Sequence, residues 1–316
     1  MSTNPNLDVQ ARFVSAVFGG DFDTLLKKAD MAMYRAKDAG RNSYQFFDEQ
    51  MNIEAVEHLA LRNGLRRALE RNELEVHYQP QINLQTGQVV GAEALLRWNH
   101  PALGMVSPGR FIPIAEESGL IVPIGEWVLQ EACRQAMNWK AAGLPDLLIA
   151  VNLSVVQFKR GEVEHAVIRA LEQTGFEPSL LELEITESVL IHDAEKVLAT
   201  IQRLKLLGVK LSIDDFGTGY SSLSYLKRFA VDKLKIDQSF IRDLATDQDD
   251  AAIVRAIIQM AHSLNLQTIA EGVEDEKILK HLEIFHCDEA QGYHIAKPMP
   301  AHKFAEFLAK TPELAF

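Results

Sequence analysis

The sequence has few of the residues that build disulfides and zinc sites. Its only cysteines are Cys133 and Cys287, and neither stands at the spacing of a metal motif. The ten histidines show no ligand spacing either. We therefore expect both cysteines to be reduced core thiols of a cytoplasmic protein, and we exclude a disulfide scaffold and a histidine–cysteine zinc centre.

Long apolar runs and an excess of positive charge are also missing. No apolar run approaches the roughly 18 residues of a membrane span, and no secretory signal precedes the first charged segment. The 44 acidic residues outnumber the 32 basic ones, which gives a formal charge of −12. This balance disfavours direct binding of a long nucleic acid, which depends on a basic surface.

The chain does have the composition of a globular protein, with 47% hydrophobic and 24% charged residues among 316. Short apolar runs alternate with amphipathic stretches of helical length, for example Ile124 to Ala142, Ala194 to Leu207 and Ala251 to Leu264. The alternation recurs about eight times from Leu74 to Leu308. It predicts an α/β fold of the TIM type, a (β/α)8 barrel of parallel strands wrapped by helices.

Polar side chains recur near the carboxyl ends of these apolar runs. They are Glu93, Asn152, Glu184, Asp214, Asp215, Lys235 and Glu271. Active sites of such barrels lie at the carboxyl ends of the strands, so we expect these side chains to converge. The adjacent acids Asp214 and Asp215 repel each other unless a cation lies nearby. Since neighbours on a strand point to opposite faces, one acid should face the barrel axis while the other turns with the loop.

These groups suit one kind of chemistry. Carboxylates and an amide oxygen are hard ligands that favour Mg²⁺ or Mn²⁺. There are enough acids for two ions, with Asp214 placed to bridge them, and two ions can clamp a phosphodiester and activate a water molecule. Lys235 would add positive charge beside that water, and Arg97 suits a forked contact to a phosphate oxygen.

Each of these residues, considered alone, could also have a purely structural role. Glu184 and Glu271 could be surface or capping residues, and Asn152 could cap a following helix. Lys233 is expected to be a solvated residue at a strand end. A rival catalytic interpretation is a proton-abstracting barrel of the enolase type, in which Lys233-Leu234-Lys235 supplies bases and the acids hold Mg²⁺. Coincidence at so many strand ends favours a shared site.

The segment Gly91 to Trp98 contains Glu93-Ala94-Leu95, and it resembles the naming motif of the EAL family of cyclic di-GMP phosphodiesterases. The resemblance covers about Leu65 to Leu308. It includes Tyr78-Gln79-Pro80, Val151-Asn152-Leu153-Ser154, Glu184-Ile185-Thr186-Glu187, Asp214 to Ser222, Lys235-Ile236-Asp237, Glu271-Gly272-Val273-Glu274 and Gln291-Gly292-Tyr293. It implies a TIM-type barrel whose first strand, about Leu74 to Asn83, runs antiparallel to the rest, and commonly a homodimer.

The resemblance also implies an activity and its residues. The activity is hydrolysis of cyclic di-GMP to linear pGpG, dependent on Mg²⁺ or Mn²⁺ and inhibited by Ca²⁺. The implied metal ligands are Glu93, Asn152, Glu184, Asp214, Asp215 and Glu271. Lys235 matches the lysine that holds or activates the water, Glu271 is assigned to catalysis as well, and Glu187 matches the glutamate that positions the Asp214 loop. The implied substrate contacts are Gln79, Glu93, Leu96, Arg97, Asn152, Gln157, Lys235, Glu271, Glu274 and Tyr293.

A second interpretation within the family is that the chain is a receptor, which binds cyclic di-GMP without hydrolysing it. Such receptors usually lack one or more metal ligands, whereas this sequence lacks none.

The first residues are organised differently. We expect residues 1–48 to be a helix–strand remnant, 49–64 a connecting helix and 65–316 the barrel. Asp21 to Phe47 resembles the tail of a GGDEF diguanylate cyclase domain, and Gly19 to Asp23 lies where that family does not place its signature loop. We therefore expect no cyclase activity and a chain that is part of a longer multidomain signalling protein, which could be membrane-tethered. The connecting helix either packs on the barrel or transmits a signal to it.

Overall fold

The structure is a computed structural model, and it describes residues 49–160, 163–190, 194–217 and 228–310 together with positions 24, 26–29, 32–33, 46–47 and 226. The chain divides into two compact units, Met1–Leu65 and Arg66–Phe316. Helix α3 spans Glu49–Ala68. Most of the predicted GGDEF-like remnant lies outside the described residues, so the boundaries at 48 and 64 stay predictions.

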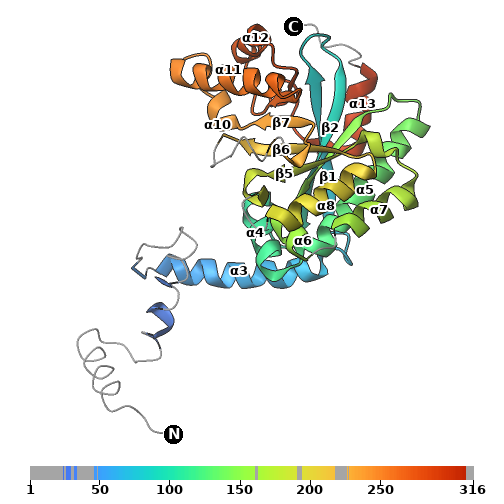
Figure 1. The fold of residues 1–316 in the computed structure, drawn as a ribbon. Coiled ribbons are helices and arrows are strands. Elements are labelled where there is room, and N and C mark those ends of the chain that lie inside the picture. Colours follow the sequence, from blue (N-terminus) through green and yellow to red (C-terminus); the bar gives the residue numbers. More distant parts are fainter. Residues whose placement is uncertain are drawn as a thin grey trace. The chain divides into compact units, whose positions relative to one another are not determined.

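The second unit is a closed barrel (Figure 1). Its strands are β1 (Leu74–Asn83), β2 (Val89–His100), β4 (Leu148–Leu153), β5 (Leu181–Thr186), β6 (Lys210–Phe216), β7 (Lys233–Ile236), β8 (Gln267–Ala270) and β9 (Glu289–Ala290). Around the ring the order is β1-β9-β8-β7-β6-β5-β4-β2, and β1 pairs again with β2. Two short strands, β3 (Gly104–Val106) and β10 (Met299–Pro300), add to β2 and β1.

The first strand runs against the others. β1 is antiparallel to both β2 and β9, whereas the pairs from β2 through β9 are parallel. This confirms the predicted barrel and its antiparallel first strand, which has the predicted bounds of Leu74 to Asn83.

Helices wrap the barrel between its strands, as the ribbon shows (Figure 1). They are α4 (Pro108–Ser118), α5 (Ile121–Ala141), α6 (Val155–Arg160), α7 (Val163–Thr174), α8 (Ala194–Leu206), α10 (Gln238–Ile241), α11 (Gln248–Ser263), α12 (Glu276–Ile284) and α13 (Ala301–Lys310), with short 3-10 turns η1 (Pro178–Leu180) and η2 (Glu187–Leu190). None of the helices in these ranges has both the length and the apolar character that crossing a bilayer requires.

Two helices begin earlier than the apolar periodicity predicts. The predicted helix from Ala251 starts at Gln248, because the side chain of Asp247 accepts hydrogen bonds from the backbone N–H groups of Asp249 and Asp250. The predicted helix from Ile124 starts at Ile121. The first turn of the helix from Gln248 holds Asp249 and Asp250, so an apolar stripe alone misses it, whereas the helix from Ile121 has Pro123 in its first turn.

Strand residues alternate between two environments, and this alternation positions the site. In β6, Leu211 and Ile213 are fully buried apolar residues, while Ser212 and Asp214 point to the opposite face. Contacts between strands that are not neighbours, described below, show that the polar face is the barrel interior. The apolar face packs beneath the helices, so the barrel buries aliphatic residues outside its ring and charged residues inside it.

Candidate active site

The predicted strand-end residues meet around one ammonium group. Lys235 Nζ lies 2.7 Å from Glu184 Oε2, 3.1 Å from Asp214 Oδ1 and 2.6 Å from Glu271 Oε1. Glu93 Oε1 is 3.8 Å away. These acids come from β5, β6, the end of β8 and β2, so side chains scattered over nearly 180 positions of sequence share one centre.

Burial and charge repulsion shape the protonation of this centre. Burial raises the pKa of Glu271 to about 8. Burial and the neighbouring Glu93 raise the pKa of Glu184 well above its ordinary value. Burial opposes the charge of Lys235, but the surrounding carboxylates outweigh it and hold the Lys235 pKa well above its usual range. The Lys235 ammonium and the raised pKa values of Glu184 and Glu271 both reduce the repulsion among these acids.

Amide groups hold the carboxylate of Glu93 in place. Asn152 Nδ2 donates to Glu93 Oε1 at 2.6 Å, and Gln291 Nε2 donates to Glu93 Oε2 at 2.5 Å. Gln291 also donates to Gln79 Oε1 at 3.0 Å. Burial opposes ionisation of Glu93, yet Lys235 and these amides outweigh it and lower the pKa of Glu93. Lys235 and the two amides therefore favour the ionised form of Glu93.

The two adjacent aspartates diverge as the strand ends. Asp214 points inward to Lys235, whereas Asp215 is exposed and has a positive φ of 54°, a backbone conformation that a non-glycine residue rarely adopts. Partial desolvation and the nearby Asp214 raise the pKa of Asp215 to about 6, although its side chain stays largely in contact with solvent. Their divergence follows the alternation expected from the sequence.

A cavity of about 460 Å³ opens above this centre. It is lined by Gln79, Glu93, Leu95, Asp214, Gln238, Arg242, Glu271, Gly272, Glu274, Gln291, Gly292 and Tyr293. The predicted positions Gln79, Glu93, Glu271, Glu274 and Tyr293 are among these. Lys235 and Glu184 are 1% exposed or less and lie beneath the floor, reaching the cavity through their contacts with Asp214 and Glu271.

Besides Lys235, four predicted substrate contacts are not part of the cavity lining, and the first of them, Asn152, contacts it only through its hydrogen bond to Glu93. Leu95 lines the cavity and Leu96 does not, because successive side chains of β2 point to opposite faces. Arg97 is half-buried and donates from Nη1 to the carbonyl of Leu96 at 2.9 Å. Gln157 is buried, and its Oε1 accepts from the backbone N–H of Ser154 at 2.9 Å at the start of α6. The structure does not bring Leu96, Arg97 or Gln157 to the cavity lining.

Sequence reasoning assigned no role to Gln291, Gln238 or Arg242. Gln291 stands directly before Gly292-Tyr293 in the quoted motif, which was the one available signal. Gln238 and Arg242 belong to the region of α10, and nothing in their spacing indicates that this short helix faces the cavity.

Glu187 begins η2, directly after β5, and is 5% exposed. Neither of its carboxylate oxygens has a hydrogen-bond partner among the described residues. The loop that it was predicted to hold lies, beyond Gly217, outside the described residues. Its positioning role therefore stays a prediction.

The expectation for Lys233 was wrong. It is not solvated but 1% exposed, and it forms ion pairs with Glu182 and Glu289. Its side chain points into the barrel on the same face as that of Lys235, two residues further on.

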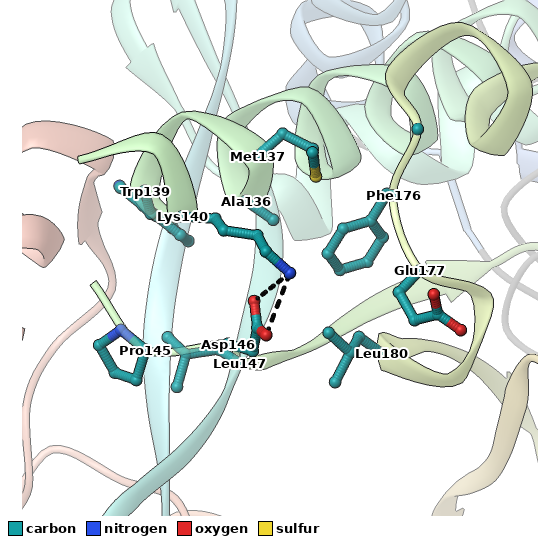
Figure 2. A pocket seen from close by; sticks show the side chains of 11 residues that line it. Ala136, Met137, Trp139, Lys140, Pro145, Asp146, Leu147, Phe176, Glu177 and Leu180 are labelled. Atoms are coloured by element: carbon teal, nitrogen blue, oxygen red, sulfur yellow. Dashed lines mark hydrogen bonds and ion pairs between the residues drawn. The ribbon is translucent and has the colours of Figure 1, made fainter. Parts of the chain in front are cut away.

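A second, smaller cavity of about 80 Å³ lies elsewhere (Figure 2). It is formed by the end of α5, the segment leading into β4 and the turn before β5. Phe176 and Leu180 line one side, and Lys140 pairs with Asp146 across it at 3.0 Å. Because it lies at the amino ends of β4 and β5, away from the converging acids, it is not part of the candidate active site.

The donors of the main site suit a hard divalent cation. Asp214, Asp215 and Glu271 each offer a carboxylate oxygen, and these oxygens lie within 4.8 Å of one another. Glu184 Oε2 pairs with Lys235 Nζ, whereas Glu184 Oε1 is buried without a hydrogen-bond partner among the described residues. A set of carboxylates with one amide matches Mg²⁺ or Mn²⁺ and lacks the imidazole and thiolate ligands of zinc sites.

Comparison with known proteins identifies the barrel. The family model described as the EAL domain matches residues 62–298. The chain belongs to the EAL domain family. This membership replaces the enolase-type interpretation, and it agrees with the residues that converge at the carboxyl ends of the strands.

Two full-length relatives and one solved structure are similar to this chain. The chain is 49% identical over 304 residues to the bifunctional diguanylate cyclase/cyclic di-GMP phosphodiesterase MucR of Pseudomonas aeruginosa, covering 95% of this chain and 44% of that protein. It is 44% identical over 291 residues to the cyclic di-GMP phosphodiesterase PdeR of Escherichia coli, covering 92% and 44%. A solved structure described as the PaMucR phosphodiesterase in complex with c-di-GMP has 50% identity and a TM-score of 0.75, covering 78% and 99%. The chain spans less than half the length of the two full-length relatives.

Proposed function

We propose that this EAL domain hydrolyses cyclic di-GMP to linear pGpG. The observation that carries the proposal is the convergence of Glu93, Glu184, Asp214 and Glu271 on Lys235 beneath an open cavity. It is supported by the 50% identity to a phosphodiesterase whose structure is described as a c-di-GMP complex.

In the proposed site, two divalent cations, Mg²⁺ or Mn²⁺, would be held by Glu93, Asn152, Glu184, Asp214, Asp215 and Glu271. Bound cations would polarise a phosphoryl oxygen and lower the pKa of a water molecule. The residues of this chain would orient the water and the substrate for the reaction. Water oxygen attacks phosphorus, the bond from phosphorus to the ribose 3′ oxygen breaks, and the 3′ oxygen takes up the proton that the water loses.

Lys235 is the proposed group that orients the attacking water. Its ammonium is fixed by Glu184 and Glu271 at 2.7 and 2.6 Å beneath the cavity floor, where it would stabilise negative charge that develops on the water. Glu271 is assigned to catalysis as well because it contacts both Lys235 and the cavity.

The substrate is proposed to lie across the rim of the cavity. Gln79, Glu274 and Tyr293 line it, and Tyr293 is 58% exposed, with Lys297 Nζ 5.3 Å from the centroid of its ring. An exposed aromatic face suits stacking against a guanine base. Arg97, Leu96 and Gln157 stay predicted contacts that would require side-chain movement on binding.

The decisive experiment incubates the purified chain with cyclic di-GMP and Mg²⁺ or Mn²⁺ and follows pGpG by chromatography. We expect pGpG with either cation, none with excess chelator, and inhibition by Ca²⁺, whose larger and looser coordination shell fits the site poorly. Asp214→Asn is the matched inactive control. Tight binding of cyclic di-GMP without pGpG would instead assign the chain as a receptor.

The remaining expectations concern the whole protein. We propose that the chain acts as a homodimer in the cytoplasm within a longer multidomain signalling protein and has no cyclase activity. The greater lengths of MucR and PdeR support the multidomain setting. Turnover measured against protein concentration tests whether dimerisation is needed.

A further inference from the structure

A second set of buried charges lies in the barrel interior, and the proposed reaction does not use it. Lys233 Nζ is 3.1 Å from Glu182 Oε2 and 2.8 Å from Glu289 Oε2. The side chains of Lys233 and Glu182 are at most 1% exposed, and that of Glu289 is 8% exposed. Because β6 separates β5 from β7 and β8 separates β7 from β9, these ion pairs cross the interior of the barrel.

Lys233, Glu182 and Glu289, which we call the lower charge layer, have the same strand spacing as residues of the candidate site. Each of its members stands two positions before a site residue: Lys233 before Lys235, Glu182 before Glu184, and Glu289 before Gln291. A two-residue step keeps side chains on the same face and separates them by about 7 Å along a strand. The lower layer therefore lies directly under the residues that contact Glu93, Asp214 and Glu271.

Packing alone gives no reason for charges at this depth. Barrel interiors are commonly filled with branched aliphatic side chains, and such residues often stabilise a fold as well as a buried ion pair does. The ion pairs add a fixed geometry, because one ammonium holds two carboxylates that come from two other strands. A site that depends on the positions of Glu184, Lys235 and Gln291 gains from such a link.

We propose that Lys233 is a positioning residue: by joining β5, β7 and β9 through Glu182 and Glu289, it fixes where Glu184, Lys235 and Gln291 converge. Its effect on turnover rests on the proposed phosphodiesterase function, whereas its effect on cation binding does not. Lys233 touches neither the cavity nor the proposed ligands, so it acts only through its neighbours.

The test is the triple variant Lys233→Met/Glu182→Gln/Glu289→Gln. Its side chains keep the shape of the lower charge layer and carry no charge. Lys233→Met alone would leave two buried carboxylates uncompensated and is expected to unfold the barrel. In the triple variant no buried charge is orphaned, so we expect a folded protein by circular dichroism. Calorimetry should show Mn²⁺ binding weakened about 10- to 100-fold, and kcat should fall at least about tenfold with little change in KM.

The control variant is Lys205→Met. Lys205 on α8 pairs with Asp232 at 2.6 Å, outside the barrel interior. This change should lower the melting temperature while leaving Mn²⁺ affinity as in the wild type. If the triple variant folds and its Mn²⁺ affinity and kcat both stay within about threefold of wild type, the positioning role is overturned.

A second variant covers the case in which the triple variant does not fold. Glu289→Gln keeps the shape and leaves Lys233 and Glu182 as a one-to-one pair, so no charge is left uncompensated. We expect Mn²⁺ affinity to fall several-fold, because the link to β9 and Gln291 weakens. Unchanged affinity would overturn the proposal. A wild-type protein that binds Mn²⁺ but makes no pGpG would refute the phosphodiesterase function and leave this comparison valid.

Discussion

Asn152 donates a hydrogen bond from Nδ2 to Oε1 of Glu93 at 2.6 Å, which joins the ends of two neighbouring barrel strands. The bond fixes the orientation of the amide, because the nitrogen is committed to Glu93 and the oxygen is left for another partner. An oxygen held in this way is a preformed donor for a cation.

Asn152→Ala should weaken Mn²⁺ binding about 10- to 100-fold and abolish hydrolysis, because it removes both the oxygen and the group that orients Glu93. Calorimetry and the pGpG assay measure the two effects. Asn99→Ala, at an exposed position of β2, is the control and should match the wild type. Wild-type cation affinity in Asn152→Ala would remove it from the proposed ligand set.

Lys235→Met should separate cation binding from chemistry. Removing the ammonium leaves four acids without their internal counter-charge, so divalent cations should bind as tightly as in the wild type or more tightly. Turnover should nevertheless fall by at least about 100-fold, because the group that orients the water is lost. Weaker Mn²⁺ binding by calorimetry would show that Lys235 supports the ligands rather than the water.

The pH dependence of stability should report on Glu271. Its pKa is raised to about 8 in the folded chain, from an ordinary value of 4.5. Between these values the folded state binds more protons than the unfolded state, so the free energy of unfolding of the metal-free protein falls as pH rises from about 4.5 to about 8. Mg²⁺ replaces the proton, and the gain in melting temperature on adding Mg²⁺ should therefore be larger at pH 8.5 than at pH 5.5. An equal gain at both pH values would contradict this protonation state.

Glu187→Ala should lower both Mg²⁺ affinity and turnover. Its buried carboxylate requires a partner, and we expect that partner in the loop that follows Asp215. Glu195→Ala removes an exposed carboxylate paired with Arg228 and serves as the control. Should Glu187→Ala bind Mg²⁺ normally, the expected role in positioning the loop would be wrong.

The sequence allowed the barrel and the centre of its site to be predicted for one physical reason. Parallel strands end at a common rim, so acids that repeatedly follow apolar runs must meet there. Glu93, Glu184, Asp214 and Glu271 belong to this pattern, and their contacts with Lys235 agree with it.

Other features depend on information that strand-end patterns lack. Leu96 was assigned from the family resemblance, whereas alternation along the strand from Glu93 places Leu95 on the cavity side. The burial of Lys233 depends on Glu182 and Glu289, which lie 51 and 56 positions away in the chain. A charged residue at a strand end is ordinarily solvated, so only the pairing reveals that this one is inside.

The reversed direction of β1 decides how the polypeptide approaches the site. In a barrel whose strands are all parallel, the chain enters at the end remote from the chemistry, whereas here Leu74 starts beside Trp98, beyond Glu93 along β2. A tether attached ahead of β1 therefore arrives at the catalytic rim. Tension on it would act on β1 at Gln79 and, through Gln291, on Glu93 at the opposite side of the hydrogen-bond chain.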